Sequence, residues 1–263
     1  MTEPRPLALV TGASSGIGFE LARQFAEAGF DLIVNAEDPT IDTAAAKLRS
    51  SGTAVSGFQA DLRSATGVEA LWAAVEATGR PLAAAALNAG VGQGGAFVEV
   101  PVERDLEIIE LNVTSTVRLA KLVLRDMAAR DEGRLLITSS IASTMPGPYQ
   151  AIYNASKSFV QSFAEALAAE LRDTGVTVTS LMPGPTDTDF FDRAELEDTK
   201  LGAGPKDDPA QVAEQGFQAL MAGKDKVVAG SLLTKAQAAG NAVLPDRLKA
   251  AGHAKLAEPG SAE

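Results

Sequence analysis

The stretch LALVTGASSGIGFELARQFAEAG, residues 7–29, joins a strand, a glycine-rich turn and a helix. Residues 7–10 form a short, continuously apolar run, which is typical of a strand buried on both faces of a parallel sheet. The turn over residues 11–18 leads into a helical pattern that ends at Gly29. Glycines let the backbone approach a pyrophosphate closely, and a helix N-terminus supplies N–H donors. The stretch therefore predicts a phosphate-binding turn, with a plain tight turn as the alternative.

Beyond this stretch, apolar runs and helical patterns alternate along the chain. We expect strands at 31–35, 54–60, 82–87, 134–139, 176–181 and 226–229, and helices over 42–50, 64–78, 103–130, 151–173 and 210–222, with a last helical stretch to about Ala250. No repeat and no Pro/Gly/Ser-rich linker interrupts the alternation. It predicts one α/β domain over residues 1–250, a Rossmann-like doubly wound sheet of seven parallel strands with helices on both faces.

The segment after Met182 changes character, since it mixes prolines and glycines with many acidic residues. It is too long for a simple connection, so we expect a substrate lid over about 184–208 at the strand carboxyl ends. Its apolar side chains and those opposite favour a moderately apolar carbonyl or alcohol (Phe190, Phe191, Leu196 and Leu201, facing Met145, Pro146, Tyr149 and Ile152). Its acidic residues disfavour an anionic substrate. We expect residues 251–263 to be a disordered tail, with His253 solvated.

Composition narrows the class of protein. The 263 residues include no cysteine and one histidine, and the net charge is −11. Disulfides, thiolate zinc sites and cysteine nucleophiles are thereby excluded, and we expect no metal site and a reducing, cytoplasmic location. The negative charge argues against nucleic acid or an anionic membrane as the main partner. We expect neither a signal peptide nor a membrane helix, because no stretch approaches about 20 apolar residues.

Three side chains in the stretch 140–157 can do chemistry: Ser140, Tyr153 and Lys157. On a helix, Tyr153 and Lys157 would lie on one face, one turn apart. A free phenol has a pKa near ~10, and a neighbouring ammonium and a helix N-terminus would lower it toward the range of general acid–base catalysis. Ser140, at the end of an apolar run, could hold a carbonyl oxygen beside that phenol. Taken alone, a Tyr and a Lys at this spacing more often mark a solvated helix.

The residues that follow the second strand normally meet the adenosine ribose of a dinucleotide. Here they are Ala36, Glu37 and Asp38, and no Arg or Lys stands there or in the glycine turn. A carboxylate repels a 2′-phosphate and can bind a free ribose hydroxyl. The sequence thus favours NAD(H) over NADP(H), with a simple turn before Pro39 as the alternative.

Together these motifs resemble those of the short-chain dehydrogenase/reductase family, in its single-domain form of roughly 250 residues. The resemblance covers about residues 5–230. TGASSGIG at 11–18 resembles the family's TGxxxGxG cofactor turn, LNAG at 87–90 resembles NNAG with a leucine in first place, and PGPTDT at 183–188 resembles the segment that touches the nicotinamide. Asn112, Ser140, Tyr153 and Lys157 match its catalytic tetrad in order and spacing.

The resemblance implies an NAD(P)-dependent oxidoreductase that transfers a hydride between a nicotinamide and a ketone or secondary alcohol, acting on CH–OH groups. Ser140 would position the substrate oxygen, Tyr153 transfer the proton and Lys157 hold the nicotinamide ribose, with Asn112 helping a water connect Lys157 to solvent. Asp61 would contact the adenine. The full set of implied cofactor contacts is Gly12, Ser14, Ser15, Gly16, Ile17, Gly18, Ala36, Glu37, Asp61, Leu62, Asn88, Ala89, Gly90, Tyr153, Lys157, Pro183, Gly184, Thr186 and Thr188.

Two other functions stay open. A non-catalytic dinucleotide-binding sensor on the same fold would predict loss of tetrad residues, yet all four are present. A nucleotide-sugar epimerase or dehydratase usually has the spacing TGxxGxxG and a larger C-terminal domain. In the family that this chain resembles, the helices matching 103–130 and 151–173 pair across a two-fold axis, so we expect a homodimer or homotetramer.

Overall fold

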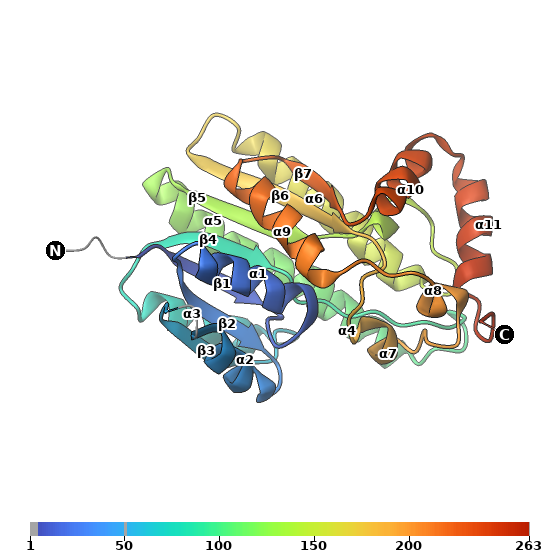
Figure 1. The fold of residues 1–263 in the computed structure, drawn as a ribbon, viewed down its shortest axis with the longest axis horizontal. Coiled ribbons are helices and arrows are strands. Elements are labelled where there is room, and N and C mark those ends of the chain that lie inside the picture. The colour runs from blue at the N-terminus through green and yellow to red at the C-terminus, as the bar shows by residue number, and fades with distance from the viewer. Residues whose placement is uncertain (1–4, 50–51, 263) are drawn as a thin grey trace.

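The computed structural model describes residues 5–49 and 52–262. The first four residues, the last residue of the helix expected over 42–50 and the final residue of the expected tail lie outside the described residues. Within them, seven parallel strands form one sheet in the order β3-β2-β1-β4-β5-β6-β7 (Figure 1). This confirms the predicted sheet. Its strands are β1 (Leu7–Thr11), β2 (Asp31–Ala36), β3 (Val55–Gln59), β4 (Leu82–Leu87), β5 (Gly133–Thr138), β6 (Val176–Pro183) and β7 (Lys226–Ala229).

Helices cover both faces of the sheet. The strands alternate their side chains between two apolar clusters, so that Val10 faces one cluster and Leu9 the other. The first cluster is closed by α1 (Gly16–Glu27), α2 (Thr40–Leu48) and α9 (Pro209–Met221). The second is closed by α3 (Ala65–Glu76), α5 (Thr116–Arg130) and α6 (Ala151–Glu170). The Rossmann-like architecture expected from the alternating pattern is therefore confirmed.

The strand order reverses beside β1, which pairs with β2 on one side and β4 on the other. In open α/β sheets, a crevice for ligands forms at the carboxyl ends of the strands at such a point. The helical elements that do not cover the faces of the sheet gather at this end of it (Figure 1). They are η3 (Ile141–Thr144), α7 (Phe190–Arg193), α8 (Lys200–Ala203), α10 (Leu232–Val243) and α11 (Asp246–Ala257), with α4 (Val102–Ile108) leading into η2 (Ile109–Ser115).

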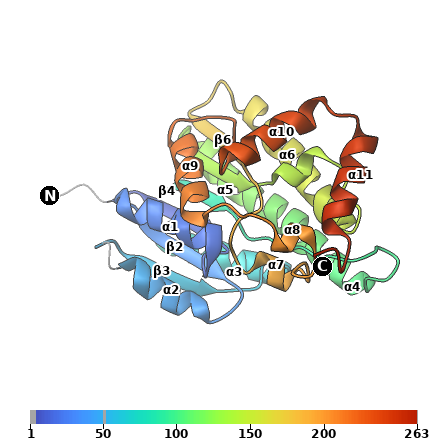
Figure 2. The same ribbon diagram turned by 45° about the vertical axis from the view of Figure 1, so that its right-hand side comes forward.

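The C-terminal segment differs from the disordered tail expected over 251–263. α11 runs to Ala257 and lies against α8 in the lid, as Figure 2 shows. The backbone N–H of Gly260 donates to the Asp198 carboxylate at 2.9 Å, and His253 is buried with Nδ1 3.1 Å from the Pro148 carbonyl oxygen. The expectations of disorder and of a solvated His253 were wrong, because contacts with distant residues order this segment.

Candidate active site

A cavity of about 420 Å³ lies over the carboxyl ends of the central strands. Every residue predicted to contact a cofactor lines it, from the glycine turn to Thr188. Ser140, Tyr153 and Lys157 line it as well, whereas Asn112 does not. The fold thus gathers into one cavity the predicted cofactor residues, which lie up to 176 positions apart in the sequence, between Gly12 and Thr188.

The glycine turn leaves bare backbone at one wall of this cavity. Gly12 and Gly16 have φ values of +65° and +56°, in the left-handed region that favours glycine. A Cβ atom on Gly12 would lie 2.9 Å from the Ala89 Cα, and one on Gly18 only 2.0 Å from the Gly12 carbonyl oxygen. α1 begins at Gly16, so its first-turn N–H groups lie beside the cavity. This wall can accept the negative charge of a pyrophosphate.

The turn is fixed to β4 by side-chain bonds. Thr11 Oγ1 accepts hydrogen bonds from the backbone N–H groups of Asn88 (3.0 Å) and Ala89 (3.1 Å). Thr138 Oγ1 donates to Asn88 Oδ1 at 3.0 Å, which links the same point to β5. The leucine that replaces the first residue of the NNAG signature is buried in the core. The leucine in place of the family's asparagine therefore does not affect these polar contacts.

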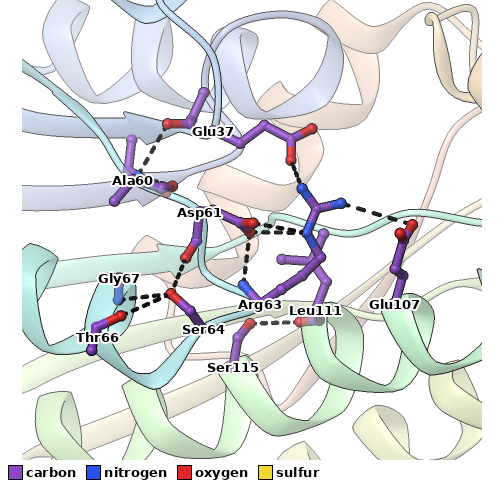
Figure 3. Close-up of polar contacts among 12 residues, drawn as sticks. Glu37, Ala60, Asp61, Arg63, Ser64, Thr66, Gly67, Glu107, Leu111 and Ser115 are labelled. Carbon is purple, nitrogen blue, oxygen red and sulfur yellow. Dashed lines mark hydrogen bonds and ion pairs between the residues drawn. The ribbon is translucent and has the colours of Figure 1, made fainter. Parts of the chain in front are cut away.

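A cluster of charges lies where the adenosine ribose is expected. Glu37 and Asp61 line the cavity, and Arg63 pairs with both carboxylates, at 2.9 Å to Asp61 Oδ1 (Figure 3). The third guanidinium nitrogen of Arg63, Nη1, lies 3.9 Å from the Glu107 carboxylate. Burial raises the pKa of Asp61, but hydrogen bonds from Arg63 outweigh it and lower that pKa.

Sequence reasoning missed Arg63. Arg63 belongs neither to the glycine turn nor to the end of β2, because it lies 26 positions beyond Glu37 in the sequence. Its place two residues after Asp61, a residue already expected at the adenine, was the available signal.

Tyr153 and Lys157 lie in the first two turns of α6, which begins at Ala151. Lys157 Nζ donates to the Thr138 carbonyl oxygen at 3.0 Å and lies 5.9 Å from the centre of the Tyr153 ring. Ser140 hydrogen-bonds with Tyr153, and its Oγ accepts from the Ala142 N–H at 3.1 Å. The end of β5 thus holds the lysine beside the tyrosine, and the segment that follows β5 carries the serine.

The pKa values of this group differ from the sequence-based expectation. Burial raises the pKa of Tyr153 to about 12, although the hydrogen bond with Ser140 lowers it in part. Burial lowers the pKa of Lys157 to about 8. The expectation that Lys157 brings the phenol pKa down toward neutrality was wrong for this arrangement, because burial disfavours the charged form of both groups. At neutral pH, Tyr153 is protonated and can donate a proton.

Asn112 lies behind the cavity wall, in η2. This π-helical segment interrupts the single helix expected over 103–130, and such segments often occur at functional sites. Asn112 accepts from the Val91 N–H and donates to the Val91 carbonyl oxygen, both at 2.9 Å, and donates to Ser156 Oγ at 3.0 Å. A Cβ atom on Gly90 would lie 3.1 Å from Asn112 Oδ1 and 3.3 Å from Lys157 Nζ. The Asn112 and Lys157 side chains therefore both lie next to Gly90.

The lid supplies part of the predicted apolar surface. The Phe190 ring lies 5.2 Å from the Tyr153 ring, centre to centre. Phe191, Leu201 and Met145 also line the cavity. Four expected apolar contacts do not line it: Pro146, Tyr149, Ile152 and Leu196, the last of which is buried within the lid.

A further part of the cavity wall comes from α10, α11 and the short link between them, which sequence reasoning did not assign to the site. Their apolar side chains there are Leu244, Leu248 and Leu256, and their polar ones are Gln237, Asn241, Lys249 and His253. No local motif marks these residues, since only the packing of the two helices brings them to the cavity.

Over residues 5–49 and 52–262, no group of three or more His, Cys, Asp or Glu side chains is arranged to hold a metal ion. Over the same residues, no helix combines the length and apolar character that crossing a membrane requires.

Comparison with known proteins finds the same family that the sequence motifs resemble. A family model described as short chain dehydrogenase matches residues 6–199. The 3-oxoacyl-acyl-carrier-protein reductase FabG of Vibrio cholerae is 32% identical over 213 residues, which are 79% of this chain and 86% of that protein. A short-chain dehydrogenase from Sphingobium yanoikuyae in complex with NADPH superposes with a TM-score of 0.79 at 30% identity, covering 85% of this chain and 87% of its own. A relative from Burkholderia phymatum in complex with NAD gives 0.78 at 26% identity, covering 87% and 90%.

Proposed function

The chain belongs to the short-chain dehydrogenase/reductase family, and from this premise we propose that it transfers a hydride between a nicotinamide cofactor and a ketone or secondary alcohol, with Tyr153 as the general acid and base. The observation that carries the proposal is the Tyr153 hydroxyl, bonded to Ser140 and next to Lys157, in the cavity that the glycine turn also lines. A purified sample mixed with NADH and a panel of ketones tests it by the loss of NADH absorbance.

The bare backbone of Gly12 and Gly18 and the N-terminus of α1 fit a dinucleotide pyrophosphate. When bound, the cofactor supplies or accepts the hydride at the substrate carbon. In the direction of reduction, Ser140 and Tyr153 hold the carbonyl oxygen by their hydroxyl groups. Tyr153 then donates its proton to that oxygen, so the product is an alcohol and Tyr153 becomes a tyrosinate. Ser140 and the Lys157 ammonium stabilise the tyrosinate.

The charges at the end of β2 support NAD(H) as the preferred cofactor. Glu37 can accept hydrogen bonds from a ribose diol and repels a 2′-phosphate. Arg63 is one nearby cation that could bind such a phosphate, but Glu37 and Asp61 already pair with it. To bind the 2′-phosphate of NADP(H), the Arg63 guanidinium would first have to leave these two carboxylates. Arg193, which lines the cavity, is a second cation near the end of β2, and it lies beside Asp38 and Asp189. Of the compared structures, one holds NADPH and another NAD, which supports a nicotinamide cofactor of either kind, so the proposed preference rests on the charges at the end of β2 alone.

An exposed apolar face supports a homodimer or homotetramer. Val102, Leu106 and Ile109 lie exposed on α4 and the start of η2, and Phe159 on α6. Phe159 stacks on Phe163 at 5.9 Å between ring centres, which holds it at the surface. A second copy of the chain, placed about a two-fold axis on this face, would cover the four side chains.

A dinucleotide-binding sensor is the alternative function. It would bind NADH but convert no substrate. The ketone panel separates the two functions when it is run beside a fluorescence titration with NADH, because a sensor would show binding and no turnover with any member of the panel.

A further inference from the structure

The part of the cavity closed by α10 and α11 carries polar groups among apolar ones. Both helices follow residue 199, so they lie outside the part of the chain that the family model matches. The inference that follows rests on the proposed function, because it takes this cavity as the substrate site. An apolar cavity with a few convergent polar groups is the usual form of a small-molecule site.

Two nitrogen donors from the two helices converge on Thr144. Asn241 Nδ2, from α10, donates to Thr144 Oγ1 at 3.1 Å, and Lys249 Nζ, from α11, donates to the Thr144 carbonyl oxygen at 2.8 Å. Both donors line the cavity, where Asn241 is 8% exposed and the Lys249 side chain 10% exposed. Thr144 is the last residue of η3, four positions after Ser140. An amide and an ammonium therefore lie together near the catalytic serine.

Each donor has hydrogen-bonding capacity left over. A lysine ammonium has three N–H groups, and Lys249 uses one on Thr144 and one on Asp246 at 2.7 Å. Asn241 has two amide N–H groups and uses one on Thr144. The Asp246 carboxylate is 76% exposed, so solvent weakens its hold on the ammonium. One N–H group on each side chain, with a positive charge beside them, matches the two oxygens of a carboxylate.

We propose that Asn241 and Lys249 bind a carboxylate of the substrate, remote from the carbonyl that is reduced. The enzyme then prefers oxo acids and the corresponding hydroxy acids over neutral ketones. This reverses the expectation that the acidic lid disfavours an anionic substrate. Of the lid's acidic side chains only Asp189 lines the cavity, and Arg193 lies 3.8 Å from it.

The experiment compares 4-oxopentanoate, 5-oxohexanoate and 7-oxooctanoate with their methyl esters, using NADH and the full chain. For at least one chain length, we expect the wild type to show a KM for the acid about 10-fold or more below that for the ester. Lys249→Met and Lys249→Gln should raise the KM for that acid by a similar factor and should change the KM for the ester much less. Asp246→Asn, which releases the ammonium, should lower the KM for the acid.

The matched control is Lys255→Met, which removes an exposed lysine that does not line the cavity from the same helix. It should change neither acid nor ester kinetics. Equal KM values for acids and esters at every chain length, or equal losses for both in the Lys249 variants, would overturn the proposal. The latter result is what a purely structural role for Lys249 predicts.

Calorimetry separates this proposal from the proposed function. Titration of the three acids and their esters into the protein with NAD⁺ measures binding without turnover. If no compound is reduced but one acid binds more tightly than its ester, and Lys249→Met removes the difference, then the carboxylate site stands and the proposed reaction fails. If ketones are reduced while no acid binds more tightly than its ester, the reaction stands and the carboxylate site is refuted.

Discussion

Lys157 Nζ lies 5.9 Å from the centre of the Tyr153 ring while it donates a hydrogen bond to the Thr138 carbonyl oxygen at 3.0 Å. The end of β5 thus fixes the cation beside the phenol. Because the two groups are buried together, the pKa of Tyr153 is raised to about 12 and that of Lys157 is lowered to about 8. Tyr153 is then protonated across the neutral range, and of these two groups Lys157 titrates closer to neutrality.

The first prediction concerns the pH dependence of reduction. Above a pH of about 8, Lys157 loses its proton and no longer stabilises the developing tyrosinate. We expect kcat/KM for a ketone, at saturating NADH, to be level from about pH 6 to about pH 7.5 and to fall above about pH 8. Lys157→Met should be slower throughout and should lack this fall. A level wild-type profile up to about pH 10 would contradict the assignment.

The second prediction concerns stability. The pKa of Lys157 is about 8 when folded, below its ordinary 10.5, so between these values the unfolded chain binds the extra proton. Its contribution to the free energy of unfolding therefore rises with pH across that window. Lys157→Met should lack this rise and, near pH 7, be more stable by about 1–2 kcal/mol, after allowance for the lost bond to Thr138.

Urea unfolding at several pH values measures this effect. Lys224→Met is the matched control, because Lys224 is exposed. If Lys157→Met were less stable than the wild type near pH 7 and kept the same pH slope, the buried charge would not carry the cost assigned to it.

Local patterns were sufficient to predict the sheet and the residues gathered at its edge. The runs at 7–10 and 82–87 are continuously apolar because both faces of these strands are covered by helices. The glycine turn and the Tyr153–Lys157 pair are contiguous motifs, so their positions follow directly from the elements that carry them.

Features set by distant contacts could not be predicted in this way. α11 is rich in alanine and lysine and has a weak apolar pattern, and it is ordered by the bonds of its region to Thr144, Pro148 and Asp198. The π-helical segment at Asn112 depends on bonds with Val91, 21 positions away. The raised pKa of Tyr153 depends on its burial, which no spacing of residues reveals.

The third prediction concerns cofactor choice. Glu37→Ala removes the carboxylate that repels a 2′-phosphate and frees part of the Arg63 guanidinium. We expect the ratio of kcat/KM with NADPH to that with NADH to rise by about 10-fold or more. Glu37→Ala combined with Arg63→Met should lose most of that rise. Glu69→Ala, an exposed acidic residue on α3, is the control; a ratio unchanged by Glu37→Ala would show that these charges do not set the preference.

The fourth prediction concerns assembly. Phe159→Arg places a charge in the exposed apolar face of α4, η2 and α6, where a second copy would bury it at high cost. We expect sedimentation at micromolar concentration to show a dimer or tetramer for the wild type and a smaller species for the variant. Val243→Arg, at an exposed apolar position on α10 that lies outside this face, should leave the assembly unchanged. A wild-type monomer would refute this proposal.

The most direct test of the account is the turnover of Tyr153→Phe, which removes only the hydroxyl group of the proposed acid. The account predicts a fall in kcat of at least about 100-fold, with the Kd for NADH within about 2-fold of the wild type. Tyr149→Phe is the matched control, because Tyr149 is the other tyrosine of the chain and does not line the cavity. Near-native turnover by Tyr153→Phe would contradict the central claim that this phenol transfers the proton.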